Sequence, residues 1–100
     1  MSVLVTGRIP GDTSKFREFI ASQPDVMRRI SDEARSKGCL HHQFGIGDGF
    51  VIVVDEWESA EAFNDFFQNN ADIPTVMRDA GAQGEPEFTF AEAVETVDKF

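Results

Sequence analysis

Two short segments carry the side chains whose chemistry stands out. Residues 38–44 read Gly-Cys-Leu-His-His-Gln-Phe and residues 54–57 read Val-Asp-Glu-Trp, and both have the composition of β-strands. The Asp-Gly pair at 48–49 is typical of a two-residue hairpin turn in which both residues can adopt positive φ. Counting back from that turn predicts that His42 lies directly opposite Asp55 on the neighbouring strand.

A histidine held by a carboxylate is the arrangement that general-base catalysis uses. Cβ atoms directly opposite on neighbouring strands are roughly 5 Å apart, so we expect a hydrogen bond between His42 and Asp55. The carboxylate would fix the tautomer of the imidazole and stabilise its protonated form. Trp57 follows on the same face of the strand and would wall the same space. The predicted catalytic set is therefore His42, Asp55 and Trp57.

These residues also have structural interpretations, which the sequence leaves open. Cross-strand polar pairs such as His42 with Asp55 commonly do no more than stabilise a sheet, and a tryptophan at a strand end often only packs. A bulge at Gly45 or Gly47 would offset the pairing by one residue and place His41 at the cavity instead of His42.

The register assigns side chains to the two faces of the sheet. The face of His42 and Asp55 is much the more apolar, so we expect helices to cover it. The other face, with His41 opposite Glu56 and Gln43 opposite Val54, is expected to turn toward a partner sheet. The pairs expected on the covered face are Ile46 with Val51, Phe44 with Val53, His42 with Asp55 and Leu40 with Trp57.

The first part of the chain reads as a strand followed by a helical stretch. Residues 2–9 alternate between apolar and other side chains, as in a strand. Residues 13–37 have apolar side chains at helical spacing, and Gly38 is expected to end the helix. Pro24 interrupts that spacing, so we expect a kink or a restart there. The expected capping residues are Asp12 or Thr13 at the start, and a capping-box-like pair of Ser22 with Asp25 at the restart.

The second part completes an α+β arrangement. Ser59 is expected to cap a helix that runs through Asn69, a short helix spans 72–81, and residues 87–97 alternate as a last strand. The order is β-α-β-β-α-(α)-β, which predicts a ferredoxin-like sandwich with an antiparallel sheet, as one domain over residues 1–100.

Composition narrows the classes of function. The formal net charge of −9 argues against nucleic-acid and anionic-membrane partners, which need a basic surface. A single cysteine excludes an internal disulfide, and no cluster or spacing indicates a metal or a cofactor site. The first ten residues lack the pattern of a signal peptide, which favours a cytoplasmic location.

The segments at 38–44 and 54–63, with Ala-Gly at 80–81 and Pro-Glu-Phe at 86–88, resemble the antibiotic-biosynthesis monooxygenase superfamily of small dimeric α/β barrels. They are most similar to an actinobacterial branch of uncharacterised members with the His-His and Asp-Glu-Trp motifs. The resemblance covers nearly the whole chain. It implies a homodimer and a pocket between each sheet and its helices.

The superfamily includes haem degraders, cofactor-free oxygenases, cyclases and isomerases. Haem degraders use an Asn on the first strand, a Trp ending the third strand and a His on the next helix. This chain has only Trp57, with Thr6 or Gly7 on the first strand and no His between 60 and 70, which argues against haem degradation. Cofactor-free oxygenases combine a Trp with an Asn and often a Tyr. Asn64 is present, but the chain contains no Tyr.

These observations together predict a small-molecule pocket protein without a cofactor, acting as a monooxygenase on an aromatic or polyketide-like substrate. The alternatives are a non-catalytic ligand-binding or regulatory dimer, and a cyclase or isomerase that uses the same histidine. His42 would deprotonate the substrate and Trp57 would stack on it. The residues expected to contact this apolar or aromatic ligand are Thr6, Phe44, Phe63, Asn64, Phe67 and Met77.

Overall fold

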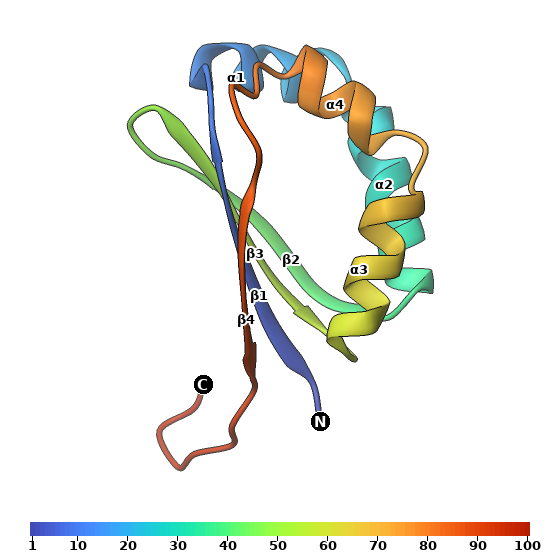
Figure 1. The fold of residues 1–100 in the computed structure, drawn as a ribbon, viewed down its shortest axis with the longest axis vertical. Helices are drawn as coiled ribbons and strands as arrows, with labels where there is room; N and C mark the ends of the chain where they lie inside the picture. The colour runs from blue at the N-terminus through green and yellow to red at the C-terminus, as the bar shows by residue number, and fades with distance from the viewer.

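The computed structural model describes residues 1–100, which form one antiparallel sheet and four helices (Figure 1). The strand order is β2-β3-β1-β4, as in a ferredoxin-like fold. In chain order the elements are β1 (Val3–Pro10), α1 (Thr13–Ser22), α2 (Pro24–Ser36), β2 (Cys39–Ile46), β3 (Phe50–Trp57), α3 (Ala60–Asn69), α4 (Ile73–Asp79) and β4 (Glu87–Glu92).

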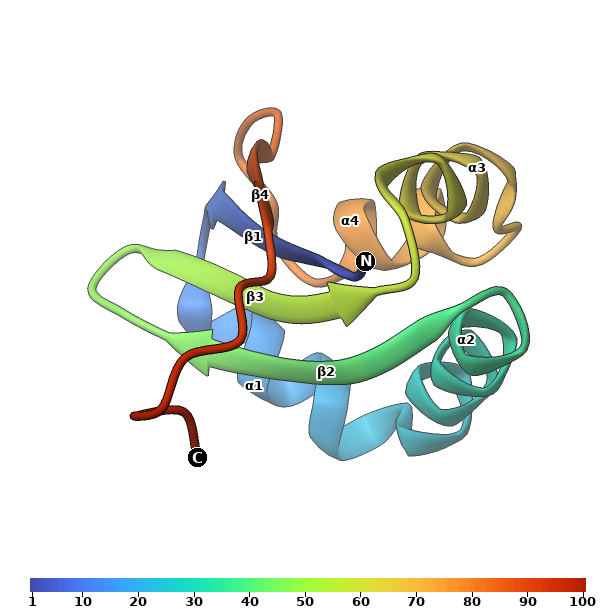
Figure 2. The ribbon, with the colours of Figure 1, turned by 90° about the horizontal axis from the view of Figure 1, so that it is seen from below.

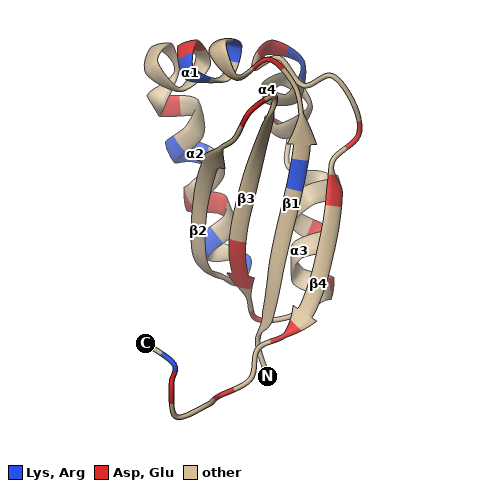
Figure 3. Ribbon diagram, turned by 90° about the vertical axis from the view of Figure 1, so that its left-hand side faces the viewer, with Lys and Arg blue, Asp and Glu red and all other residues tan.

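All four helices lie on one side of the sheet, and the other side is bare (Figures 1 and 2). Figure 3 views the bare side, where most strand residues are uncharged. The predicted ferredoxin-like α+β fold is therefore confirmed. The buried side chains form two clusters between the sheet and the helices, one around Val5, Trp57 and Phe63 and the other around Phe16, Phe19 and Val51.

The predicted hairpin register is confirmed over most of its length. His42 pairs with Asp55, Phe44 with Val53 and Ile46 with Val51. On the bare face, His41 pairs with Glu56 and Gln43 with Val54, also as expected. The turn itself differs from the expectation, because only Gly49 has a positive φ, of 81°, and Asp48 does not.

The pairing predicted for Leu40 is wrong. The register shifts between Cys39 and His41, so Cys39 takes the place opposite Trp57 and Leu40 is left over in a bulge. Leu40 is 57% exposed as a result. Neither Gly45 nor Gly47 carries a bulge, so His42 and not His41 lies on the helix-covered face.

The helix boundaries follow local chemistry. Asp12 caps α1, accepting hydrogen bonds from the backbone N–H groups of Ser14 (2.9 Å) and Lys15 (3.2 Å), and Ser59 caps α3. Pro24 starts the separate helix α2, but the predicted capping box is not formed. The Ser22 hydroxyl instead donates to the carbonyl of Phe19 at 3.3 Å.

The last strand is shorter than predicted and ends at Glu92. Glu92 pairs with Val3, the first residue of β1, and the N–H of Ala93 donates to the carbonyl of Ser2. Residues beyond Ala93 have no neighbouring strand to bond to, so their alternation in the sequence produces no further strand.

Candidate functional site

Asp55 joins His42 and Trp57 into one hydrogen-bonded set. One oxygen of the Asp55 carboxylate, Oδ1, lies 2.7 Å from Nδ1 of His42. The other oxygen, Oδ2, accepts a hydrogen bond from Nε1 of Trp57 at 3.0 Å. Trp57 is 1% exposed and Asp55 is 5% exposed, whereas the His42 side chain is 35% exposed. Each oxygen of the buried carboxylate thus has a hydrogen-bond partner, and the histidine is the most exposed member of the set.

The sheet itself creates this geometry. Asp55 and Trp57 are two residues apart on β3, so their side chains share a face, and His42 lies directly across on β2. Because the indole N–H can only donate, it requires an acceptor at Oδ2. With the carboxylate accepting at both oxygens, Nδ1 of His42 is the donor, so in the neutral imidazole Nε2 is the nitrogen that has the lone pair.

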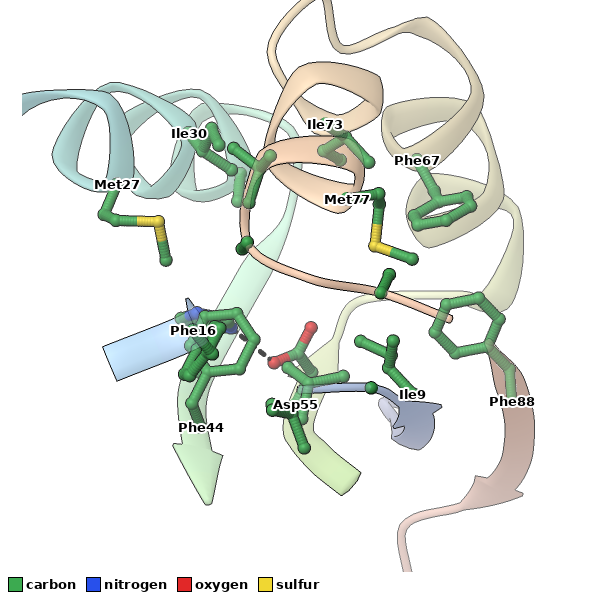
Figure 4. Close-up of a pocket in the computed structure, with 18 of the residues that line it drawn as sticks. Ile9, Phe16, Met27, Ile30, Phe44, Asp55, Phe67, Ile73, Met77 and Phe88 are labelled. Carbon is green, nitrogen blue, oxygen red and sulfur yellow. Dashed lines mark hydrogen bonds and ion pairs between the residues drawn. The ribbon is translucent and has the colours of Figure 1, made fainter. Parts of the chain in front are cut away.

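An apolar cavity of about 130 Å³ lies between the sheet and the helices, and His42, Asp55 and Trp57 all line it. All eight elements contribute lining residues. Figure 4 shows the Asp55 carboxylate among apolar side chains from α1, α2, α3, α4 and the sheet. The other cavity-lining residues labelled there are Ile9, Phe16, Met27, Ile30, Phe44, Phe67, Ile73, Met77 and Phe88.

Aromatic rings surround the hydrogen-bonded set. The Phe44 ring meets the His42 imidazole edge-on, with centroids 4.8 Å apart and an interplanar angle of 84°. The Phe63 ring meets Trp57 in the same way at 5.6 Å. Edge-to-face contacts are a favoured geometry for aromatic rings, so they stabilise the imidazole and the indole in these orientations.

The structure brings seven of the nine residues predicted for the site to the cavity. His42, Asp55 and Trp57 are there, together with the expected contact residues Phe44, Phe63, Phe67 and Met77.

Thr6 and Asn64 are corrections to that prediction. Thr6 is exposed on the bare face of the sheet, because it pairs with Val54 and Thr89, whose side chains also point away from the helices. Its neighbour Gly7 lies on the covered face. Asn64 is exposed on α3, one position after the buried Phe63, so it points away from the sheet.

Sequence reasoning missed the contribution of β4 and the reason for Gly7. Phe88 of β4 lines the cavity and lies opposite Gly7 of β1. A Cβ atom at Gly7 would lie 2.6 Å from Phe88 Cε1 and 2.9 Å from Val53 Cγ1. A side chain at position 7 would therefore displace Phe88, and only a glycine allows this ring to close that end of the cavity. The available signal was a glycine that shares one face of the strand with two apolar residues, Val5 and Ile9.

Polar contacts attach the segment before α4 to α2, and α4 lines the cavity. Asn70 is buried, its Oδ1 accepts from the N–H groups of Asp72 and Ile73, and its amide also contacts Glu33 of α2. Arg29 of α2 donates two hydrogen bonds of 2.8 Å to Asp72, which hold the pKa of that carboxyl below its usual range. The segment before α4 is thereby fixed to α2.

Cys39 is buried next to the site. Its thiol donates to the carbonyl of His41 at 3.3 Å. Burial and, after it, the nearby negative charge of Asp55 raise the pKa of the Cys39 thiol to about 11. The neutral thiol is therefore the form that the fold favours.

This shift predicts a loss of stability at alkaline pH. The unfolded chain releases the thiol proton near its ordinary pKa of 9.0, whereas the folded chain releases it only near 11. The stabilising contribution is complete below pH 9 and lost as the pH rises toward 11. Comparing denaturant unfolding of the wild type and Cys39→Ala from pH 8 to 11 should show a steeper decline for the wild type. Equal slopes would contradict the shift. The chain contains no Tyr, so no phenol titrates in the same range.

No group of three or more His, Cys, Asp or Glu side chains is arranged to hold a metal ion. None of the helices has both the length and the apolar composition that crossing a membrane requires.

Comparison with known proteins shows which solved structures share this fold. No family model and no curated protein sequence matches this chain. Solved structures do match. One is the ActVA-Orf6 monooxygenase of Streptomyces coelicolor in complex with nanaomycin D (TM-score 0.68, 14% identity, covering 99% of this chain and 93% of that one). Another is SnoaB, a cofactor-independent oxygenase of Streptomyces nogalater (TM-score 0.65, 17% identity, 98% of each chain).

A conserved protein of Methanosarcina mazei matches equally well, with a TM-score of 0.67, 12% identity and 91% of each chain covered. At these identities the likeness concerns the fold and not the activity. This chain therefore has the fold of the antibiotic biosynthesis monooxygenases, as its sequence resemblance implied.

Proposed function

We propose that this chain binds a planar phenolic or enolic small molecule in the apolar cavity and oxidises it with O₂, without a cofactor. The observation that carries the proposal is the position of His42, whose Nδ1 is held by the buried Asp55 carboxylate at the wall of that cavity. This leaves Nε2 as a base beside an apolar space, where a deprotonated substrate is electron-rich.

The reaction balances without a metal or flavin. His42 takes the phenol proton, and the phenolate transfers an electron to O₂. The resulting radical and superoxide combine at the carbon para to the oxygen, forming a C–O bond. The protonated His42 returns its proton to the peroxide. Loss of the ring C–H proton then breaks the O–O bond, so that the products are a quinone and water.

The other cavity residues have supporting roles in this proposal. Asp55 is a positioning residue that acts through His42. Trp57 is buried and positions the Asp55 carboxylate through its Nε1, and Phe44, Phe63, Phe67 and Met77 exclude water from the radical pair. Haem degradation is not part of the proposal, since α3 offers no histidine to bind iron.

The test uses 1-naphthol, which has a free para position, as the probe. Trp57 is the only Trp and there is no Tyr, so fluorescence excited at the indole edge reports ligand at the cavity wall. We expect quenching on titration, then consumption of one O₂ for each quinone formed. Binding of 1-naphthol without oxygen uptake would contradict the oxygenase activity and support a non-catalytic ligand-binding dimer. Exchange of ring protons with solvent without oxygen uptake would indicate proton-transfer chemistry of the cyclase or isomerase kind.

We also propose that two copies of the chain form a homodimer through the bare face of the sheet. Leu4 and Val54 on that face are 45% and 39% exposed, and no helix of the chain covers them. A chain of this length buries little core of its own, so covering this face would stabilise it.

We therefore expect light scattering at micromolar concentration to give twice the mass of one chain. Val54→Lys should shift the protein to the monomer mass, because a charge at the centre of the interface would be buried. Gln68→Lys, which adds the same charge on the exposed side of α3, should leave the mass unchanged. A monomeric wild type would contradict the dimer.

A further inference from the structure

A second cavity adjoins the apolar one at His42. It measures about 210 Å³ and is lined by Ser31, Ala34 and Arg35 of α2 and by residues 39–42 of β2. The two cavities share Ser31, Ala34 and His42, so they meet along this boundary. The first cavity is walled mainly by aromatic and aliphatic groups. The second presents a guanidinium, a hydroxyl and two imidazoles.

Arg35 is the only Lys or Arg that lines either cavity. Eighteen acidic side chains are available in the chain, yet Arg35 forms no ion pair and no side-chain hydrogen bond with any of them. Arg28, Arg29 and Arg78 by contrast are each paired with an aspartate. The guanidinium of Arg35 is thus free to bind an anion from outside the chain.

The bulge in β2 shapes this second cavity. Leu40 is displaced from the pairing, and the Cys39 thiol bonds to the carbonyl of His41 across it. Bulges beside functional sites commonly redirect side chains. Here the bulge makes Cys39, Leu40, His41 and His42 all line one space facing Arg35.

We infer that the second cavity binds a carboxylate carried by the ligand whose aromatic ring occupies the apolar cavity. The inference rests on the proposed function and names its substrate class, an aromatic hydroxy acid. The planar guanidinium matches a carboxylate in a bidentate fashion. Ser31 and the imidazoles supply further donors. The charges near this space act in opposite directions, because Asp55 disfavours an anion there and Arg35 favours one, as their effects on the Cys39 thiol show.

The carboxylate would also assist the chemistry. When His42 takes the phenol proton it becomes an imidazolium at the boundary between the two cavities. A carboxylate in the second cavity would lie next to that positive charge and stabilise it. A neutral ligand of the same shape lacks this interaction.

The test compares 3-hydroxybenzoate with 3-hydroxybenzamide, which have the same ring, the same phenol and a free para position but differ in charge. Calorimetry and Trp57 fluorescence give the two dissociation constants. We expect the wild type to bind the acid about 10-fold more tightly, since hydrogen bonds to charged groups are the strong ones. Arg35→Gln should remove that preference and leave amide binding within about twofold. Arg17→Gln, an exposed arginine of α1 outside both cavities, should change neither constant.

The outcomes separate the subsite from the pocket. Equal binding of acid and amide by the wild type would overturn the carboxylate subsite and leave the apolar pocket standing. Acid preference that survives Arg35→Gln would overturn the assignment to this cavity. Binding of neither ligand would overturn the subsite together with the proposed pocket. Arg35 is exposed in the last turn of α2, so its replacement by glutamine should not prevent folding.

Discussion

Replacing Asp55 with asparagine is expected to lower the rate of oxygen consumption by roughly 10²–10⁴-fold, the share that a positioned general base contributes. The reason lies in Trp57, whose Nε1 can only donate. It will draw the oxygen of the new amide side chain toward itself, so the amide NH₂ will face Nδ1 of His42. Nδ1 must then accept, and the imidazole proton moves to Nε2. The base that faces the substrate is lost while the shape of the site is kept.

Two readouts distinguish this tautomer change from simple damage. ¹⁵N chemical shifts of His42 should show protonated Nδ1 in the wild type and protonated Nε2 in Asp55→Asn. His42→Gln should reduce oxygen consumption as much as Asp55→Asn does. Glu56→Gln, the same type of change one residue further on the bare face, should leave the rate unchanged. An unchanged tautomer, or full activity in Asp55→Asn, would refute the role of this pair.

Replacing Trp57 with alanine is expected to destabilise the protein by about 3–5 kcal/mol, the usual cost of truncating a buried aromatic side chain. Trp57 is 1% exposed, packs against Phe63 and Phe66, and satisfies Oδ2 of Asp55. The variant creates a void and leaves a buried carboxylate oxygen unpaired. Urea unfolding followed by circular dichroism measures the loss, since the variant has no tryptophan to fluoresce.

Trp57→Phe separates the two contributions. Phenylalanine restores part of the buried area but not the N–H donor. We therefore expect Trp57→Phe to be about 1–3 kcal/mol less stable than the wild type. Phe100→Ala serves as the matched control, because that aromatic ring is fully exposed at the chain end and its removal should cost under about 0.5 kcal/mol. Equal stability of Trp57→Phe and the wild type would show that the bond to Asp55 contributes nothing.

Local signals in the sequence determined much of this fold. The caps at Asp12 and Ser59, the break at Pro24 and the turn at 48–49 depend on interactions within a few residues, and all four lie where they were expected. The pairing of His42 with Asp55 followed from the same turn, since a hairpin register is set by the length of its loop. The sequence was therefore sufficient to predict that His42 pairs with Asp55.

Other features depended on contacts between distant parts of the chain. The end of β4 at Glu92 follows from where β1 begins, and the bulge at Leu40 is a shift in the pairing of β2 with β3. Alternation along one strand reveals neither. Thr6 and Asn64 were placed at the cavity by resemblance, but strand and helix periodicity turns both outward. The second oxygen of Asp55 bonding Trp57 was likewise not foreseen.

The sequence by itself thus determined the order of elements, the covered face of the sheet and the histidine–aspartate pair. Only the tertiary structure decided that Gly7 and Phe88 close one end of the cavity, and that Arg35 lies unpaired beside His42. The physical reason is the range of the interactions. Capping and hairpin pairing act between near neighbours, whereas a cavity is the space left when eight elements pack together, and no single segment encodes it.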